Sequence, residues 1–186
     1  MATATLTPNR PGPGVRAQRQ AEVVRALAAV LPAHALLYTP EDTTPYECDG
    51  LTAYRERPLC VALPENYDQV QAVLRTCHLL DVPVVARGAG TGLSGGAMPH
   101  TLGVTLGLAK FNRILRIDPL AQTAVVQAGV RNLAISEAAA AHGLYYAPDP
   151  SSQIACTIGG NVAENSGGVH CLKYGLTLHN VLQVDG

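Results

Sequence analysis

The stretch from Arg87 to Gly96 is the part of the sequence whose residues point most directly to chemistry. Five of its ten residues are glycines. Without side chains, neighbouring backbone N–H groups can converge on one point that any Cβ would block, and this geometry suits a pyrophosphate. Taken alone, the same glycines also fit a tight turn that binds nothing. The stretch is therefore a candidate phosphate-binding loop.

Gly90, Gly92 and Gly95 also match the dinucleotide fingerprint G-x-G-x-x-G after a predicted strand. A Rossmann site needs a helix that begins inside the motif, whereas residues 97–100 contain a proline and residues typical of strands follow. Asp118 could take the place of the acidic residue that binds the ribose in Rossmann folds, which keeps this interpretation open. The missing helix nevertheless disfavours it. The sequence has no G-x-x-x-x-G-K-[ST] loop, so nucleoside triphosphate hydrolysis has no support.

A second glycine-rich stretch runs from Pro148 to Gly168 and adds hydroxyl and amide side chains to the same pattern. A mononucleotide would need only one such cradle. Two cradles indicate one extended ligand with a diphosphate and two distinct ends. The alternative for either stretch alone is that its glycines form only bends and bulges.

The elements that must position these stretches follow from hydrophobic periodicity. Apolar residues at helical spacing predict a helix over residues 16–31, which Pro32 ends. Residues 39–58 form an irregular connection. A strand over residues 60–63, a helix over 67–80 capped near Asn66, and a strand over 82–86 form a unit that normally pairs its two strands in parallel.

Beyond the first glycine stretch the pattern changes to short strands and one more helix. The predicted elements are strands over residues 102–106, 114–118 and 123–127, a helix over 133–141 that ends before Gly143, and a strand over 180–186. A domain rarely ends with a strand that has no partner. We therefore expect the chain to be incomplete at its C-terminus.

Composition excludes several classes of function. The chain has 186 residues, 13 Lys+Arg against 14 Asp+Glu, and 15% charged residues, so no cationic field is available to bind nucleic acid. No apolar run is long enough to cross a bilayer. Five cysteines without a CxxC pair disfavour a disulfide scaffold, which makes the cytoplasm the expected compartment.

From about Glu22 to its end, the chain resembles the FAD-linked oxidases of the vanillyl-alcohol oxidase and p-cresol methylhydroxylase (PCMH) type. The likeness lies in the strand and helix after Cys60, in residues 84–96 and in residues 148–168. Within that family, the chain is most similar to the catalytic flavoprotein subunits of glycolate oxidase and to D-lactate dehydrogenases.

The resemblance implies an α+β fold, in which two α/β subdomains of a PCMH-type domain clamp an extended FAD and the chain is truncated before the cap domain. The expected organisation is a disordered N-terminal arm over residues 1–14, an N-terminal helix and connecting segment over 15–58, and an incomplete FAD-binding domain over 59–186.

The resemblance also implies which residues bind the cofactor. Backbone amides of the first stretch would bind the diphosphate, and the second stretch would line the adenosine and isoalloxazine parts. The predicted cofactor-binding residues are Arg87, Gly88, Ala89, Gly90, Thr91, Gly92, Leu93, Ser94, Gly95, Pro148, Asp149, Ser152, Thr157, Gly159, Gly160, Ala163, Gly167 and Gly168. Some relatives attach FAD covalently through a His where this sequence has Thr91, so the FAD is expected to be noncovalent.

No metal site or catalytic residue is assigned. His170, Cys171 and His179 would supply only three ligands without a finger-like spacing. Cys156 lies near a second flavin attachment point of certain relatives, but a buried structural thiol is the preferred interpretation. Loop capping or solvent exposure accounts for Glu164, and the substrate-binding residues of the family belong to the cap domain.

The function implied by the resemblance is oxidation of a 2-hydroxy acid, glycolate or D-lactate, to the 2-oxo acid by hydride transfer to flavin N5. The chain alone is expected to be inactive. Expected partners are the small substrate, an iron–sulfur subunit and a second flavin-domain subunit, with no nucleic acid and with membrane contact only through those subunits. The alternatives are an NADPH-dependent flavin reductase of the same fold and a non-catalytic FAD-binding remnant.

Overall fold

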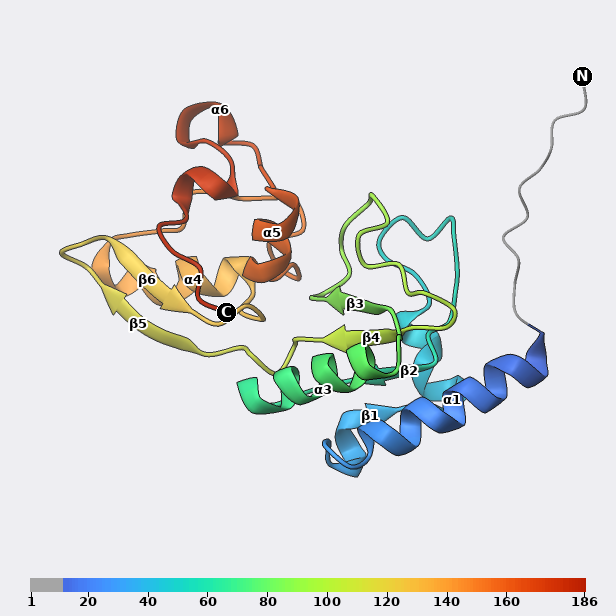
Figure 1. Ribbon diagram of the computed structural model, residues 1–186. Coiled ribbons are helices and arrows are strands. Elements are labelled where there is room, and N and C mark those ends of the chain that lie inside the picture. The colour runs from blue at the N-terminus through green and yellow to red at the C-terminus, as the bar shows by residue number, and fades with distance from the viewer. Residues whose placement is uncertain (1–11) are drawn as a thin grey trace, which may run out of the picture.

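The computed structural model describes residues 12–186, which form two lobes, each with its own sheet (Figure 1). This mixed architecture agrees with the predicted α+β class. The helices are α1 (Pro13–Leu27), α2 (Pro40–Thr43), α3 (Tyr67–Leu79), α4 (Asn132–Ala139), α5 (Ile158–Glu164) and α6 (Cys171–Tyr174). The strands are β1 (Leu36–Leu37), β2 (Cys60–Ala62), β3 (Val84–Arg87), β4 (Val104–Gly107), β5 (Ile114–Asp118) and β6 (Thr123–Val126).

The first lobe contains a four-stranded sheet of order β1-β2-β4-β3. Strands β2, β4 and β3 are parallel and β1 is antiparallel. The predicted unit of two parallel strands joined by α3 is present, but its strands do not pair directly because β4 lies between them. All four residues of β4 are buried, whereas β3 is only partly covered, so the more apolar strand takes the centre of the sheet.

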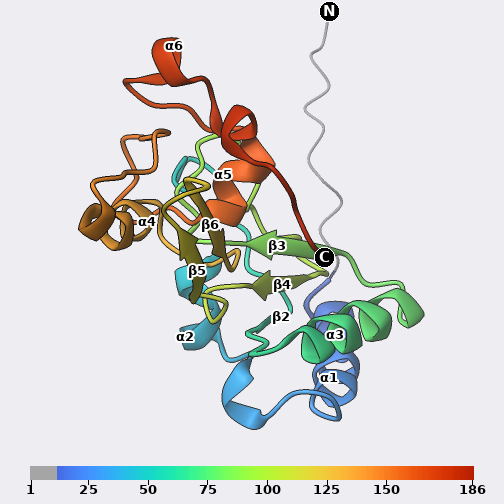
Figure 2. The same ribbon diagram turned by 90° about the vertical axis from the view of Figure 1, so that its left-hand side faces the viewer.

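Helices α1 and α3 lie side by side on one face of this sheet (Figures 1 and 2). Val23 and Leu27 of α1 and Val73 of α3 are fully buried in the core they share with the sheet. Each such side chain contributes roughly 1.5–3 kcal/mol by leaving water. Asn66 caps α3 as predicted, accepting a hydrogen bond from the Gln69 N–H at 2.9 Å.

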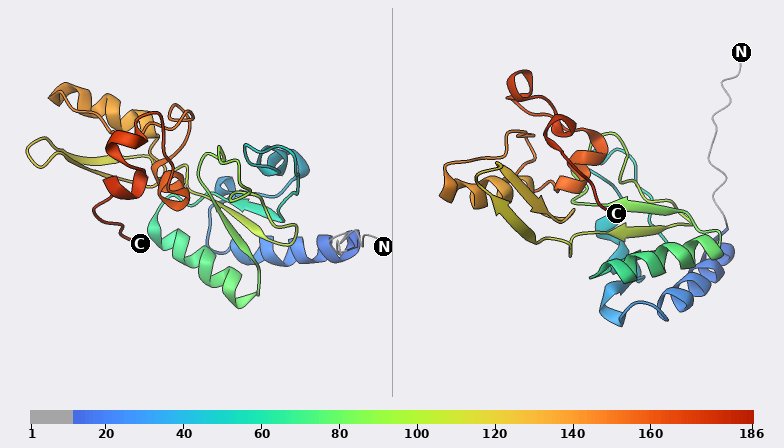
Figure 3. Two further views of the ribbon diagram at one scale, coloured as in Figure 1. Left: turned by 90° about the horizontal axis from the view of Figure 1, so that it is seen from above. Right: turned by 60° about the vertical axis from the view of Figure 1, so that its left-hand side comes forward.

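The second lobe is built on an antiparallel hairpin of β5 and β6, with α4 beside it (Figure 3). Its smaller core consists of Val130, Ile135 and Ile158. Gly143 ends the helical segment in the left-handed conformation, as the sequence predicted. Arg131 and Thr157 form an isolated antiparallel bridge, which fixes the start of α4 against the start of α5.

Several predicted boundaries were wrong. Helix α1 begins at Pro13, within the predicted arm, because proline is tolerated in a first helical turn. It ends at Leu27, before Pro32. Residues 39–58 include α2, and residues 148–168 include α5. The predicted strand over 180–186 is absent because these residues pair with no strand in the described part of the chain.

Residues 1–11, most of the predicted arm, lie outside the described residues. Within residues 12–186, no helix has the length and apolar character needed to span a membrane.

Candidate functional site

The two glycine-rich stretches meet at the edge of the first sheet where its parallel strands end. Strand β3 leads directly into Gly88, and the carboxyl ends of β3 and β4 point toward the second lobe (Figure 1). A Cβ on Gly88 would overlap Thr157 Oγ1, and a Cβ on Gly92 would lie 2.5 Å from Glu164 Oε1. The stretches therefore face each other, as the prediction of one shared ligand requires.

A cavity of about 420 Å³ lies between them. It is lined by Gly88 and Ala89 from the first stretch and by Val130, Arg131 and Thr157 from the second lobe. This volume falls within the range of small-molecule sites. Ligands of open α/β sheets bind outside the carboxyl ends of the strands, which is where this cavity lies.

The first stretch presents a row of unused backbone donors. The N–H groups of residues 88–94 donate to no acceptor in the described part of the chain. The N–H of Gly95 is different, because it donates to Asp49 Oδ2 at 2.9 Å. Gly95 was predicted to bind the cofactor, but its N–H is already bonded to Asp49 and interrupts the row of unpaired donors after Ser94.

The Arg87 side chain links the start of the first glycine stretch to neighbouring backbone carbonyls. Its guanidinium donates to the carbonyls of Cys48 at 2.7 Å and Ala97 at 3.4 Å, and lies 5.6 Å from the centre of the Tyr46 ring. The residue is only 9% exposed. The Arg87 guanidinium therefore binds the carbonyls of Cys48 and Ala97, whereas the sequence predicted that Arg87 binds the cofactor.

The second stretch divides into several parts. The carbonyl of Pro148 accepts a hydrogen bond from Asn132 Nδ2 at 3.0 Å, and a Cβ on Gly168 would overlap the Asp149 carbonyl. Pro148 is therefore held by α4, and Asp149 packs directly against Gly168. Gly167 packs against Leu176.

The remaining predicted residues of this stretch lie on or before α5. Gly159 packs against Ala128 and donates its N–H to that residue's carbonyl at 2.8 Å. Gly160 and Ala163 are exposed. The Ser152 carbonyl accepts the N–H groups of Ala155 and Cys156. Of the predicted residues in the second stretch, Thr157 is the one that lines the cavity.

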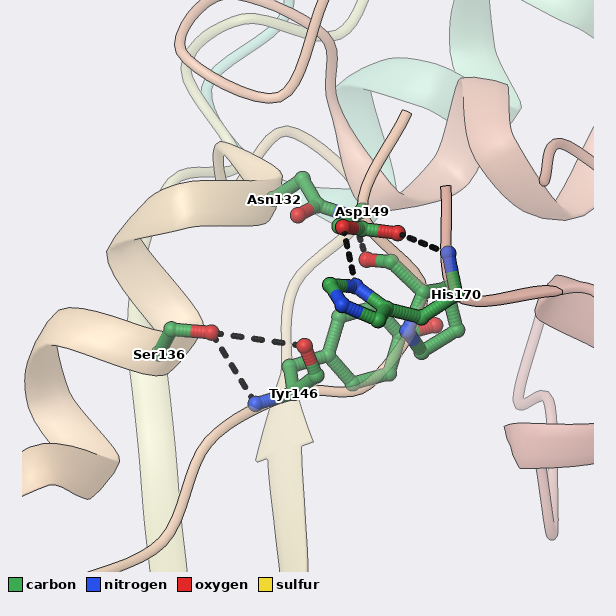
Figure 4. A network of polar contacts seen from close by, with 6 residues as sticks. Asn132, Ser136, Tyr146, Asp149 and His170 are labelled. Carbon is green, nitrogen blue, oxygen red and sulfur yellow. Dashed lines mark hydrogen bonds and ion pairs between the residues drawn. The ribbon is translucent and has the colours of Figure 1, made fainter. Parts of the chain in front are cut away.

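Asp149 and His170 form a polar pair near Asn132 and Tyr146 (Figure 4). Asp149 Oδ2 lies 2.7 Å from His170 Nδ1, and its Oδ1 accepts the His170 N–H at 3.2 Å. The backbone N–H of His170, aided by its ring, lowers the pKa of Asp149 below its usual value, while partial burial acts in the opposite direction.

The pair predicts an acid-side dependence of stability. A lowered pKa in the folded state means that the ionised Asp149 stabilises the fold above its unfolded pKa of about 3.9, and that this contribution is lost as the pH falls further. The difference in melting temperature between wild type and Asp149→Asn should therefore shrink below about pH 4. Asp185→Asn, at an exposed carboxylate, is the control, and a gap independent of pH would contradict the assignment.

The sequence interpretation missed several residues around the site. Asp49 and Gly50 were placed in an irregular connection, although a Cβ on Gly50 would lie 2.7 Å from the Thr91 carbonyl. Asn132 is fully buried and its Oδ1 has no partner in the described part of the chain. The Asp-Gly pair carries only a turn signal, which does not reveal a contact with residues 40 positions away.

The predicted metal candidates have other contacts. His170 faces Asp149, and His179 Nδ1 accepts the Leu176 N–H at 3.1 Å. No three metal-binding side chains gather anywhere in residues 12–186. Cys156 is 3% exposed, as expected for a structural thiol.

Comparison with known families decides what this site belongs to. A family model described as "FAD binding domain" matches residues 58–185. The chain belongs to this FAD-binding domain family. FAD is accordingly its cofactor, and the expected resemblance is confirmed.

Individual relatives agree with this assignment. The chain is 64% identical over 163 residues to the glycolate oxidase subunit GlcD of Escherichia coli strain K12. The aligned region covers 88% of this chain and 33% of GlcD. The chain is 40% identical over 125 residues to a D-lactate dehydrogenase of Archaeoglobus fulgidus, covering 67% of this chain and 28% of the relative. The chain thus spans about a third of the length of these curated relatives.

A solved structure confirms the fold of this FAD-binding domain. p-Cresol methylhydroxylase superimposes with a TM-score of 0.71 at 21% sequence identity, covering 80% of this chain and 30% of the other. The PCMH-type fold predicted from the sequence is therefore correct.

The residues present fit a bound FAD. A Cβ on Gly88 or Gly92 would collide with Thr157 or Glu164, so glycine at both positions lets the loop lie this close to the second stretch. The N–H groups of residues 88–94 are unpaired in the described part of the chain. Thr157 Oγ1 is buried at the cavity without a hydrogen-bond partner. Buried polar atoms normally have partners, so unused donors and an unpartnered hydroxyl at one cavity indicate a polar ligand.

Proposed function

We propose that this chain is the FAD-binding part of an oxidoreductase that converts a 2-hydroxy acid, glycolate or D-lactate, to the 2-oxo acid. The observation that carries the proposal is the 64% identity to the glycolate oxidase subunit GlcD, which extends across 88% of the chain. When bound, the flavin supplies the hydride-accepting chemistry. The chain itself supplies binding, orientation and electrostatics.

In this proposal, the N–H groups of residues 88–94 hold the diphosphate and the Thr157 hydroxyl contributes a further polar contact. Hydrogen bonds from N–H groups to phosphate oxygens need no cationic side chain, which agrees with a net charge of −1. Residues 148–168 line the remainder of the cofactor. Thr91 has no nucleophile suited to a covalent flavin bond, so we propose noncovalent binding, which release of the flavin by acid would test.

Thr157→Val tests the hydroxyl directly. Removing a buried oxygen without a partner should raise the stability of the FAD-free protein by about 1 kcal/mol, while the lost contact should weaken FAD binding by about tenfold. Calorimetric melting and fluorescence titration with FAD measure the two effects.

Thr105→Val is a matched control for this variant. Thr105 Oγ1 is also buried and without a partner among the described residues, but it lies in β4 and does not line the cavity. This variant should gain similar stability and keep its FAD affinity. Equal affinity in Thr157→Val and wild type would exclude the hydroxyl as a cofactor ligand.

A chimera tests the reaction itself. Replacing the corresponding third of Escherichia coli GlcD by this chain should give a protein that binds FAD and whose flavin absorption bleaches anaerobically with glycolate or D-lactate. The chain alone should bind FAD without being reduced by either substrate. Reduction by NADPH instead would favour the reductase alternative, and a chimera whose bound flavin no substrate reduces would favour a non-catalytic FAD-binding remnant.

We also propose the partners and the location. The relative is named as a subunit of glycolate oxidase, which supports assembly with other subunits. An iron–sulfur subunit and a second flavin-domain subunit, in the cytoplasm and touching the membrane only through these partners, stay predictions from the family resemblance. Co-purification of the chimera with the remaining glycolate oxidase subunits would test them.

A further inference from the structure

Residues 46–51, which we call the brace, lie outside residues 58–185 matched by the FAD-binding domain model. The brace nevertheless runs beside the first glycine stretch (Figure 1). Since FAD binding to that stretch is part of the proposed function, the following inference rests on it. We propose that Asp49 of the brace is a positioning residue, which sets the affinity for FAD by holding the diphosphate-binding loop in its binding conformation.

The brace contacts the loop at several points. The Tyr46 ring and the Cys48 carbonyl hold the Arg87 guanidinium, at 5.6 Å and 2.7 Å. Gly50 packs against loop carbonyls, where a Cβ would lie 2.7 Å from Thr91 O. These contacts join segments about 40 residues apart in sequence, so the conformation of the loop depends on the brace.

Asp49 is the central contact. It is 3% exposed, its Oδ1 accepts the Leu51 N–H at 3.0 Å, and its Oδ2 accepts the Gly95 N–H at 2.9 Å. It forms no ion pair with any described residue. Burying a carboxylate without a cation is unfavourable, so its value must lie in the two charge-assisted hydrogen bonds.

These bonds anchor the loop directly after a row of unpaired donors. Gly95 has φ +80, and its N–H is bonded to Asp49 Oδ2. The N–H groups of residues 88–94, which precede it, donate to no acceptor in the described part of the chain. A loop already held in this form loses less conformational entropy when FAD binds, which raises affinity through preorganisation.

The charge of Asp49 makes the proposal testable. A negative charge near an anionic diphosphate opposes binding, so Asp49→Asn would strengthen FAD binding if the carboxylate acted only through its field. As a positioning residue it has the opposite effect: an amide offers only one oxygen, and its NH₂ group cannot accept the second N–H. Asp49→Asn should therefore weaken FAD binding by about tenfold, the size of one hydrogen bond to a charged group.

The experiment titrates FAD into the full 186-residue chain and its variants and follows flavin fluorescence. Asp118→Asn is the control, because its carboxylate also accepts a turn N–H, that of Ala121, away from the site. It should keep wild-type affinity. Hydrogen exchange in the FAD-free protein should accelerate in Asp49→Asn at the N–H groups of Leu51 and Gly95, which Asp49 accepts, and stay unchanged in the second lobe.

Each result has a defined meaning. Wild-type chain that does not bind FAD would overturn the proposed function, whereas wild-type binding with equal or tighter binding by Asp49→Asn would overturn only the positioning role. Should Asp49→Asn not fold, Gly50→Ala displaces the adjoining part of the brace, and with it Asp49, without a change of charge, since its Cβ would press on the Thr91 carbonyl. Unchanged affinity in a folded Gly50→Ala would likewise overturn the inference.

Discussion

Replacing Gly90 by alanine is expected to remove FAD from the domain while leaving most of the fold intact. Gly90 has φ +71, where an L side chain costs roughly 1–2 kcal/mol. Its Cβ would also overlap the Arg87 guanidinium and lie 2.9 Å from Arg87 Nε. That guanidinium cannot move away cheaply, because the Cys48 carbonyl holds it and the group is buried.

The consequence is displacement of the loop that carries the unpaired N–H groups. We expect FAD affinity to fall by about 100-fold, corresponding to roughly 3 kcal/mol of lost binding free energy. Equilibrium dialysis with FAD measures this change, and circular dichroism verifies the fold.

Gly143→Ala separates backbone strain from loop displacement. Gly143 has nearly the same φ of +69, but a Cβ there would have no atom within 4 Å. This variant should lose stability through the same strain and keep its FAD affinity. If both variants bound FAD equally, the overlap with Arg87 would have no bearing on the cofactor.

Replacing Gly129 by alanine is expected to cause a large loss of stability. A Cβ there would overlap the Leu108 carbonyl and lie 2.8 Å from the Phe111 carbonyl, and the Gly129 N–H already donates to that second carbonyl at 2.7 Å. Backbone atoms, unlike a flexible side chain, cannot rotate away. Overpacking of this kind costs roughly 1–3 kcal/mol, so the melting temperature should fall by about 3–10 °C.

Gly129 also lines the cavity, so its displacement should change the shape of the site as well as destabilise the fold. Gly14→Ala is the control, because it lies in α1 with no atom within 4 Å of its added Cβ, and alanine favours a helix by up to about 1 kcal/mol. A melting temperature for Gly129→Ala at or above that of Gly14→Ala would refute the contact. Binding of FAD by the surviving folded fraction should also weaken.

Much of the local structure could be predicted because it depends on neighbouring residues. The cap at Asn66, the helix over Tyr67–Leu79 and the helical end at Gly143 follow from patterns of a few residues. The boundaries of α1 and the presence of α5 were missed. In α5 the two glycines hid a helix, which close packing of Gly159 on Ala128 makes possible.

From the sequence, glycine content and spacing indicated two candidate phosphate-binding stretches, because a backbone without side chains can approach a phosphate closely. The resemblance to FAD-linked oxidases, carried by the motifs of those stretches, implied FAD. Only the tertiary structure decided that β4 separates β2 from β3, that Arg87 holds carbonyls, and that Asp49 fixes Gly95. Those contacts join residues far apart in the chain. Burial and geometric fit in the folded state favour these contacts, and no local sequence pattern predicts them.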